Sequence, residues 1–220
     1  MNTTEKIHSI LEIDESYKAP SKIFEILLGD KKEREQVFNK FGEAFGYNFS
    51  YDWFHEYFEE EHADRKEKKQ DFTPNSVAEL LTKIAYCDSE NVHSYFECAC
   101  GTGGIVIADW WQIIQKHPLA FLTYEPSEDY FFLEELSDRA IPFLLLNLMI
   151  RGMNATVIHG DSLERTCKGI FYLVNESNSH MWYSSLNVMP YSDDVAEYFK
   201  VKFTDFRYPE HVETVLDNER

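Results

Sequence analysis

The sequence predicts an α/β protein in which a doubly wound, mostly parallel sheet follows a helical N-terminal subdomain. Short apolar runs of strand length end in acids or small polar residues, and one of them leads through a glycine-rich turn into a helix. The first third of the chain shows only helical apolar spacing. We therefore predict a helical subdomain over residues 1–68 and an α/β domain over residues 69–220.

Composition indicates a globular protein that stays off the membrane. Hydrophobic residues make up 44% of the 220 residues, which is enough for a sizeable core. The most apolar run, residues 141–150, is about half of the roughly 20 residues needed to cross a bilayer, and residues 1–5 lead into charged sequence without a signal peptide. The four cysteines have neither disulfide nor metal-ligand spacing, so we expect reduced thiols, a cytoplasmic protein and no metal site.

The net charge of −18, from 39 acidic and 21 basic residues, is unusual for a protein that holds DNA by itself. Three interpretations stay open. The acidic surface keeps the protein soluble, or a partner supplies the contacts to DNA, or the surface imitates DNA towards a DNA-binding protein.

The N-terminal 68 residues show helical apolar stripes at residues 7–13, 23–28 and 37–45, followed by an aromatic cluster at residues 51–58. Aromatic side chains interleaved with charges can stack on bases, but the interleaved charges here are acidic and would repel phosphate. We therefore expect this cluster to pack inside the helical subdomain. A short basic run at residues 65–69 is interpreted as a solvated linker.

The central element runs from Tyr95 to Ile107. A short apolar run ends in Glu97, three glycines follow at 101, 103 and 104, and a segment with helical spacing begins at Ile105. This order predicts a strand, a tight turn and a helix N-terminus, whose first amides face whatever lies over the turn. Before it, Thr73 and Pro74 begin a helix whose apolar stripe, Val77, Leu80, Leu81 and Ile84, is expected to be buried.

Three further strands are predicted at residues 130–133, 155–159 and 169–174, and residues 120–123 are a candidate for a strand or an extended segment. An acid that ends the second strand of such a sheet accepts hydrogen bonds from ribose hydroxyls, and both Glu125 and Glu135 are candidates for this role. Asp161, at the tip of the third strand, can accept a hydrogen bond from an exocyclic amine or cap its own turn. After the fourth strand come a helix near 195–199 and a strand near 201–206.

The segment from Glu97 to Gly104 reads Glu-Cys-Ala-Cys-Gly-Thr-Gly-Gly and resembles the Asp-Pro-Ala-Cys-Gly-Thr-Gly-Gly cofactor loop of N6-adenine DNA methyltransferases, particularly the modification subunits of type I restriction systems. Residues 70–74 and 160–163 resemble that family's Gln-Phe-Phe-Thr-Pro and Gly-Asp-Ser/Thr-Leu elements, in the same order. These matches cover residues 70–163, which is less than half of the chain. The resemblance implies a class I methyltransferase (Rossmann-like) fold, truncated at its C-terminal side, and S-adenosylmethionine as cofactor.

The resemblance also implies which residues contact the cofactor. In the family, the first element lies over the methionine end, an acid and an aliphatic residue follow the second strand, which favours Glu135, and the aspartate of the last element binds the adenine amine. The candidates are Phe72, Thr73, Pro74, Glu97, Cys98, Ala99, Cys100, Gly101, Thr102, Gly103, Gly104, Glu135, Leu136, Asp161, Ser162 and Leu163.

The family's catalytic Asn/Asp-Pro-Pro-Tyr/Phe loop has no clear counterpart. Its nearest match is Leu186-Asn187-Val188-Met189-Pro190-Tyr191, which makes Asn187, Pro190 and Tyr191 the catalytic candidates. Aligned on the proline and tyrosine, the polar position is Val188, which cannot accept a hydrogen bond, and using Asn187 needs an extra residue in the loop. The family also places three more strands after this loop, so we expect a shortened or rearranged sheet edge that invites pairing with another chain.

The favoured function is an S-adenosylmethionine-binding, methyltransferase-like protein of the DNA adenine-N6 type. It would act with a protein partner, such as a specificity or methylase-complex subunit, and reach DNA only where that partner supplies basic contacts. The alternative is a catalytically inactive relative that serves as a protein-binding regulator or DNA-mimicking decoy of a restriction-modification complex. Methylation of a small molecule or a protein is a third, weaker option.

Overall fold

A computed structural model of the protein describes residues 2–63, 73–85, 94–116, 119 and 123–214, and helices make up its N-terminal part. Two of these helices begin at side-chain caps. Asn2 and Glu5 form a reciprocal capping box at the start of α1, and the Asp30 carboxylate accepts the amides of Lys32 and Glu33 at the start of α3. The N-terminal elements are α1 (Thr3–Leu11), η1 (Ser16–Lys18), α2 (Ala19–Leu27), α3 (Lys31–Ala44) and α4 (His55–Ala63).

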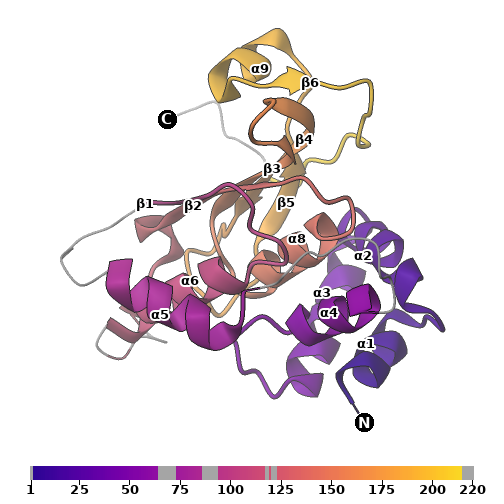
Figure 1. The fold of residues 1–220 in the computed structure, drawn as a ribbon, viewed down its shortest axis with the longest axis vertical. Coiled ribbons are helices and arrows are strands. Elements are labelled where there is room, and N and C mark those ends of the chain that lie inside the picture. Colours follow the sequence, from indigo (N-terminus) through magenta and orange to yellow (C-terminus); the bar gives the residue numbers. More distant parts are fainter. Residues whose placement is uncertain (1, 64–72, 86–93, 117–118, 120–122, 215–220) are drawn as a thin grey trace.

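The rest of the described chain builds a mixed six-stranded sheet with helices on both faces (Figure 1). Its strands are β1 (Ser94–Glu97), β2 (Tyr130–Glu135), β3 (Ala155–Asp161), β4 (Thr166–Val174), β5 (Ser185–Val188) and β6 (Lys202–Phe203). Its helices are α5 (Asn75–Ala85), α6 (Gly104–Lys116), η2 (Pro126–Glu128), α8 (Ile141–Ile150) and α9 (Asp193–Phe199). The predicted α/β fold is confirmed. A strand proposed near residues 120–123 lies mostly outside the described residues, and the predicted strand at 201–206 is shorter than expected.

The strand order is β1-β2-β3-β4-β5, with β6 beside β4. The β1–β2, β2–β3 and β4–β6 pairs are parallel, whereas β3–β4 and β4–β5 are antiparallel. Only residues 162–165 join β3 to β4, and a parallel crossover needs a dozen or more residues, so β4 must turn back along β3. In doubly wound sheets the first strand is central, but here β1 has a strand neighbour on one edge only, among the residues that the structure describes.

Helix α8 lies at the centre of the main hydrophobic core. All ten of its residues are buried, as expected for a helix that is apolar on every side. The N-terminal helices, α6, α8 and one face of the sheet share this core, while α9 and the start of β4 enclose a smaller cluster on the other face. The domain boundary predicted at residue 68 falls within residues 64–72, outside the described chain, and stays a prediction.

The apolar stripe of α5, which was expected to be buried, faces the solvent. Val77, Leu80, Leu81 and Ile84 are 42–61% exposed, whereas Ala78 and Thr82, on the opposite side of the helix, are buried. Helical spacing identifies an amphipathic helix but does not say which face meets the protein. Here the small side chains allow α5 to pack closely beside α6, and the large apolar ones remain on the surface.

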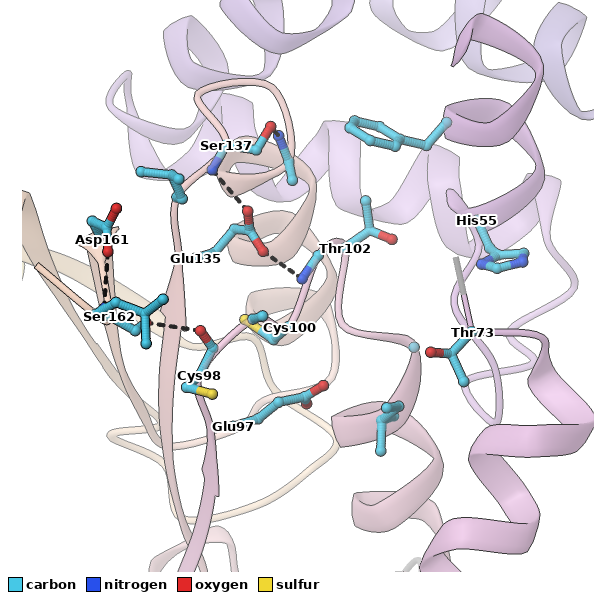
Figure 2. A pocket seen from close by; sticks show the side chains of 18 residues that line it. His55, Thr73, Glu97, Cys98, Cys100, Thr102, Glu135, Ser137, Asp161 and Ser162 are labelled. Atoms are coloured by element: carbon cyan, nitrogen blue, oxygen red, sulfur yellow. Dashed lines mark hydrogen bonds between the residues drawn. The ribbon is translucent and has the colours of Figure 1, made fainter. Parts of the chain in front are cut away.

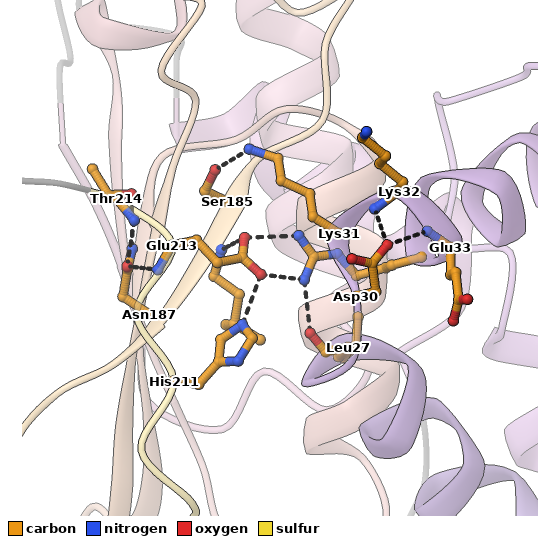
Figure 3. Close-up of polar contacts among 12 residues, drawn as sticks. Leu27, Asp30, Lys31, Lys32, Glu33, Ser185, Asn187, His211, Glu213 and Thr214 are labelled. Atoms are coloured by element: carbon orange, nitrogen blue, oxygen red, sulfur yellow. Dashed lines mark hydrogen bonds and ion pairs between the residues drawn. The ribbon is translucent and has the colours of Figure 1, made fainter.

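The C-terminal segment after β6 returns to the N-terminal helices (Figure 3). Arg34 on α3 and Glu213 form a buried two-pronged ion pair, in which Nη2 donates to Oε2 at 2.7 Å. The Glu213 carboxylate also accepts the Leu186 amide at 2.9 Å, so one side chain connects α3, the C-terminal segment and β5. Burial alone would raise the pKa of Glu213, but the hydrogen bonds from Arg34 and the Leu186 amide outweigh burial and lower it.

Glu213→Ala is expected to destabilise the fold by about 3–5 kcal/mol, because it leaves the buried Arg34 charge without a partner. Urea unfolding measures this loss, and Glu25→Ala, which removes an exposed acid from α2, is the control with little effect. Equal stability of the two variants would show that the C-terminal segment does not depend on this pair.

Candidate functional site

The glycine loop takes the conformation that its residues predict. Gly101 and Gly103 have φ of +56° and +100°, a region that other residues rarely enter. A Cβ atom on Gly103 would approach Leu144 Cδ1 to 3.0 Å, so a larger residue here would also crowd the Leu144 side chain of α8. The loop ends β1 and begins α6 at Gly104, which leaves the first amides of α6 directed over the turn.

Glu135, the last residue of β2, fixes the position of this loop. One carboxylate oxygen accepts the Gly101 amide and the other accepts the Ser137 amide, both at 2.7 Å. Each oxygen keeps a second lone pair, so a ligand hydroxyl can still donate to the carboxylate. The rival acid Glu125 lies elsewhere and accepts a hydrogen bond from Asn178 at 3.0 Å.

The buried side chain of His159 contacts the residue that follows β2. His159 Nε2 lies 3.2 Å from the Leu136 carbonyl, and Nδ1 lies 2.6 Å from the Tyr208 hydroxyl. Burial lowers the pKa of His159 to about 4, so the neutral ring donates to the carbonyl through Nε2 and accepts from the hydroxyl through Nδ1.

The tip of β3 meets the tip of β1. Asp161 Oδ1 caps its own turn by accepting the amides of Leu163 and Glu164, at 2.8 and 2.9 Å. Ser162 donates to the Cys98 carbonyl at 2.8 Å and so holds the turn against the glycine loop. One Asp161 oxygen therefore has a structural role, and the other accepts no hydrogen bond from the described part of the chain.

These strand tips surround a cavity of about 530 Å³ at the carboxyl ends of β1, β2 and β3 (Figure 2). A crevice at this edge of the sheet is where open α/β folds bind ligands. The lining residues are His55, Phe58, Thr73, Glu97, Cys98, Ala99, Cys100, Gly101, Thr102, Gly104, Ile105, Glu135, Leu136, Ser137, Ala140, Asp161, Ser162 and Leu163. Among the described residues that line the cavity, three are acids and none is Lys or Arg, and such a lining favours a cationic ligand over a phosphate.

The structure brings together in this cavity most of the cofactor candidates from the sequence, from all three matched elements. Pro74 and Gly103 do not line it, and Phe72 lies outside the described residues. The role of every candidate as a cofactor contact stays a prediction.

Sequence reasoning missed the wall that the N-terminal subdomain contributes. His55 and Phe58, from α4, line the cavity, and His55 lies across it from Asp161 and Ser162 (Figure 2). The helical spacing and aromatic content of this segment indicated only packing, and Phe58 does pack edge-on against Phe143 of α8. No local signal marks the additional role of these two side chains.

The catalytic candidates do not line the cavity. The Asn187 side chain accepts the amides of Glu213 and Thr214, and its amide group donates to the Tyr172 carbonyl, so it holds the C-terminal segment on β5. The Tyr191 hydroxyl donates to the Lys168 carbonyl at 2.9 Å. Pro190 lies next to this tyrosine and is also absent from the lining. Their proposed catalytic role gains no support from this placement.

Glu97, at the end of β1, is the acid most affected by its surroundings. Burial raises its pKa to about 7, and the nearby Glu135 carboxylate adds to the shift, while the hydrogen bond from the Tyr95 hydroxyl, at 2.8 Å, opposes it. Near neutral pH this carboxyl therefore exchanges between its neutral and charged forms. A cation in the cavity would favour the charged form.

Comparison with known families places the chain next to methyltransferases. A family model described as N-6 DNA Methylase matches residues 45–211. No match is found among curated proteins.

Three solved structures resemble the chain at low identity. One, assigned as a modification subunit of a type I restriction enzyme from Vibrio vulnificus, is 14% identical with a TM-score of 0.42, over 63% of this chain and 25% of that one. Another, assigned as a class I S-adenosylmethionine-dependent methyltransferase from Listeria monocytogenes, is 15% identical with a TM-score of 0.47, over 73% and 54%. A type I methyltransferase subunit from Streptococcus thermophilus is 18% identical with a TM-score of 0.37, over 72% and 35%.

This chain thus spans between a quarter and about half of the length of these three structures. The family model carries the assignment, because it extends over well over half of the 220 residues and includes the glycine loop and the tips of β2 and β3. The chain belongs to the N-6 DNA methylase family.

Proposed function

We propose that the chain binds S-adenosylmethionine in the cavity at the strand tips and serves, with a partner protein, in methylation of DNA adenine at N6. The observation that carries this proposal is the charge of a cavity built on the glycine loop, to which the described lining residues contribute three acids and no Lys or Arg. Membership of the N-6 DNA methylase family supports both the cofactor and the reaction. The net charge of −18 supports the need for a partner that contacts the phosphates.

The cavity residues fit the chemistry of this cofactor. The cavity volume of about 530 Å³ lies within the range of small-molecule sites. Glu135 and Asp161 can accept hydrogen bonds from ribose hydroxyls and from the adenine amine, and Glu97 can face a positive charge. Leu136 and Leu163, which are 56% and 94% exposed at the rim, offer apolar contacts to a flat ring. When bound, S-adenosylmethionine supplies a methyl group on a positively charged sulfur.

Calorimetric titration of S-adenosylmethionine should give micromolar binding to the wild type and at least tenfold weaker binding to Asp161→Asn. The variant keeps the oxygen that caps the Leu163 and Glu164 amides but loses a charged acceptor, which contributes roughly 1.5–3 kcal/mol. Glu164→Gln, an exposed change in the same turn, is the matched control. Absence of binding to the wild type would remove the cofactor proposal.

The raised pKa of Glu97 predicts that this carboxyl contributes a loss of stability to the ligand-free protein as the pH rises from about 4.5 to about 7, whereas the lowered pKa of His159 contributes a gain. In this window the folded state holds a proton that the unfolded state has released, so the loss reaches roughly 3 kcal/mol at most. Glu97→Gln should remove this dependence and melt at a higher temperature than the wild type at pH 8.

Thermal unfolding at pH 5 and pH 8 measures the effect, with Glu164→Gln as the control that keeps the wild-type pH dependence. If Glu97→Gln and the wild type change equally between the two pH values, Glu97 does not carry the raised pKa.

A second function is favoured by one specific observation: Asn187 and Tyr191 hold the C-terminal segment and do not line the cavity. On this alternative, the chain is a catalytically inactive relative that regulates a restriction-modification complex through protein contacts.

Transfer of a labelled methyl group to adenine in duplex DNA separates the two functions. An inactive regulator transfers none with any methylase-complex subunit added, whereas an active enzyme transfers it once its partner is present. Tyr191→Phe provides a further test, because a catalytic contact through the hydroxyl would be lost while the ring remains. Unchanged transfer in this variant would exclude such a contact.

A further inference from the structure

Strand β1 offers backbone groups for another strand. Its residues Ser94–Glu97 pair in parallel with residues 130–133 of β2, and no other strand of the described chain pairs with β1. The far edge therefore presents N–H and C=O groups of the kind to which an extended segment of another chain can bind.

Helix α5 supplies an apolar surface next to this edge. Val77, Leu80, Leu81 and Ile84 follow the spacing i, i+3, i+4, i+7 and form one exposed stripe. Grouped apolar side chains of this size are typical of interaction sites on soluble proteins.

Two observations connect the stripe with the strand. Thr73, just before α5, and Glu97, at the end of β1, line the same cavity, so the start of the helix lies near the tip of the strand. Helices α5 and α6 also lie side by side on one face of the sheet (Figure 1). On the other face of β1, Phe96 is 61% exposed and rests against Phe132 of β2, with ring centroids 5.8 Å apart. The start of α5 and Phe96 thus lie near the free strand β1, on opposite faces of the sheet.

We propose that the free edge of β1, the α5 stripe and Phe96 form a docking surface for a different, positively charged polypeptide, which adds a strand to β1. Hydrogen bonding along the edge requires an extended segment, and the α5 stripe requires apolar side chains on alternate residues of that segment. A second copy of this chain fits poorly, because two copies, each of charge −18, would repel each other. A partner with more basic than acidic residues is attracted instead.

The added strand would also complete the binding site, and this part of the inference rests on the proposed function. In doubly wound sheets the ligand crevice lies where the strand order reverses, next to the first strand. A strand added in parallel to β1 ends beside Glu97 and the cavity. The partner would then provide the side of the crevice that receives the substrate base, while this chain provides the side that holds the cofactor.

Site-specific photo-crosslinking tests the surface. The full chain is expressed in its source cells with p-benzoylphenylalanine in place of Leu81, Phe96 or, as a control, Tyr17, an exposed aromatic residue of η1. We expect adducts from the first two positions with one and the same protein, which has more Lys and Arg than Asp and Glu. The crosslinked residues should map to a strand with alternating apolar side chains, and the Tyr17 position should give no such adduct.

Three results would overturn the proposal: an adduct of this chain with itself, an adduct with an acidic protein or with a helix, and no adduct at either position. The purified partner then allows a quantitative test. Leu81→Asp should weaken its binding at least tenfold, Tyr17→Asp should leave it unchanged, and hydrogen exchange of the β1 amides should slow in the complex. Equal binding by the two variants would also refute the docking surface.

Titration of S-adenosylmethionine into Leu81→Asp separates this inference from the cofactor proposal. Leu81 does not line the cavity, so the variant should bind the cofactor as the wild type does. Crosslinks without cofactor binding would leave the docking surface intact and remove the cofactor. Cofactor binding without crosslinks would leave the cofactor proposal intact and remove the docking surface.

Discussion

The buried carboxylate of Asp52 joins the N-terminal segment and the glycine loop, which both line the cavity, to the central helix α8. It accepts the Thr102 hydroxyl of the glycine loop at 2.5 Å, the Asn147 amide of α8 at 2.7 Å and the backbone amide of Phe54 at 2.9 Å. A buried charge needs compensation, and Arg151, also buried, donates to the Asn147 side chain and to carbonyls of the same N-terminal segment. Because His55 follows three residues after Asp52, the segment that fixes the loop also forms the opposite wall of the cavity.

Much of the sheet and most of the cavity lining could be predicted because their signals are local. A strand, a glycine turn and a helix lie within Tyr95–Ile107, and turn geometry depends on residues a few positions apart. The choice of Glu135 over Glu125 rested on resemblance, and the structure places Glu135 against the Gly101 amide, where it orders the loop. The position of a residue that ends a strand beside a glycine turn is largely fixed by the strand and the turn.

The features that escaped prediction depend on contacts between distant residues. Periodicity identified α5 as amphipathic, but the side that packs was decided by α6, which accepts the small face of Ala78 and Thr82. The engagement of Asn187 depends on Glu213 and Thr214, more than twenty residues later. Such pairings leave no mark in the spacing of either segment.

The position of β1 at a free edge offers a structural explanation for the acidic lining of the cavity. A first strand that lies at the centre of a doubly wound sheet has a cofactor on one side of its tip and room for a second reactant on the other. Here the described chain builds only the first side, and it does so with acids, which suit a cationic cofactor and oppose a DNA phosphate. Charge and topology therefore agree with the proposed docking surface: the side of the crevice that would meet a polyanion is the side on which the described chain places no strand beside β1.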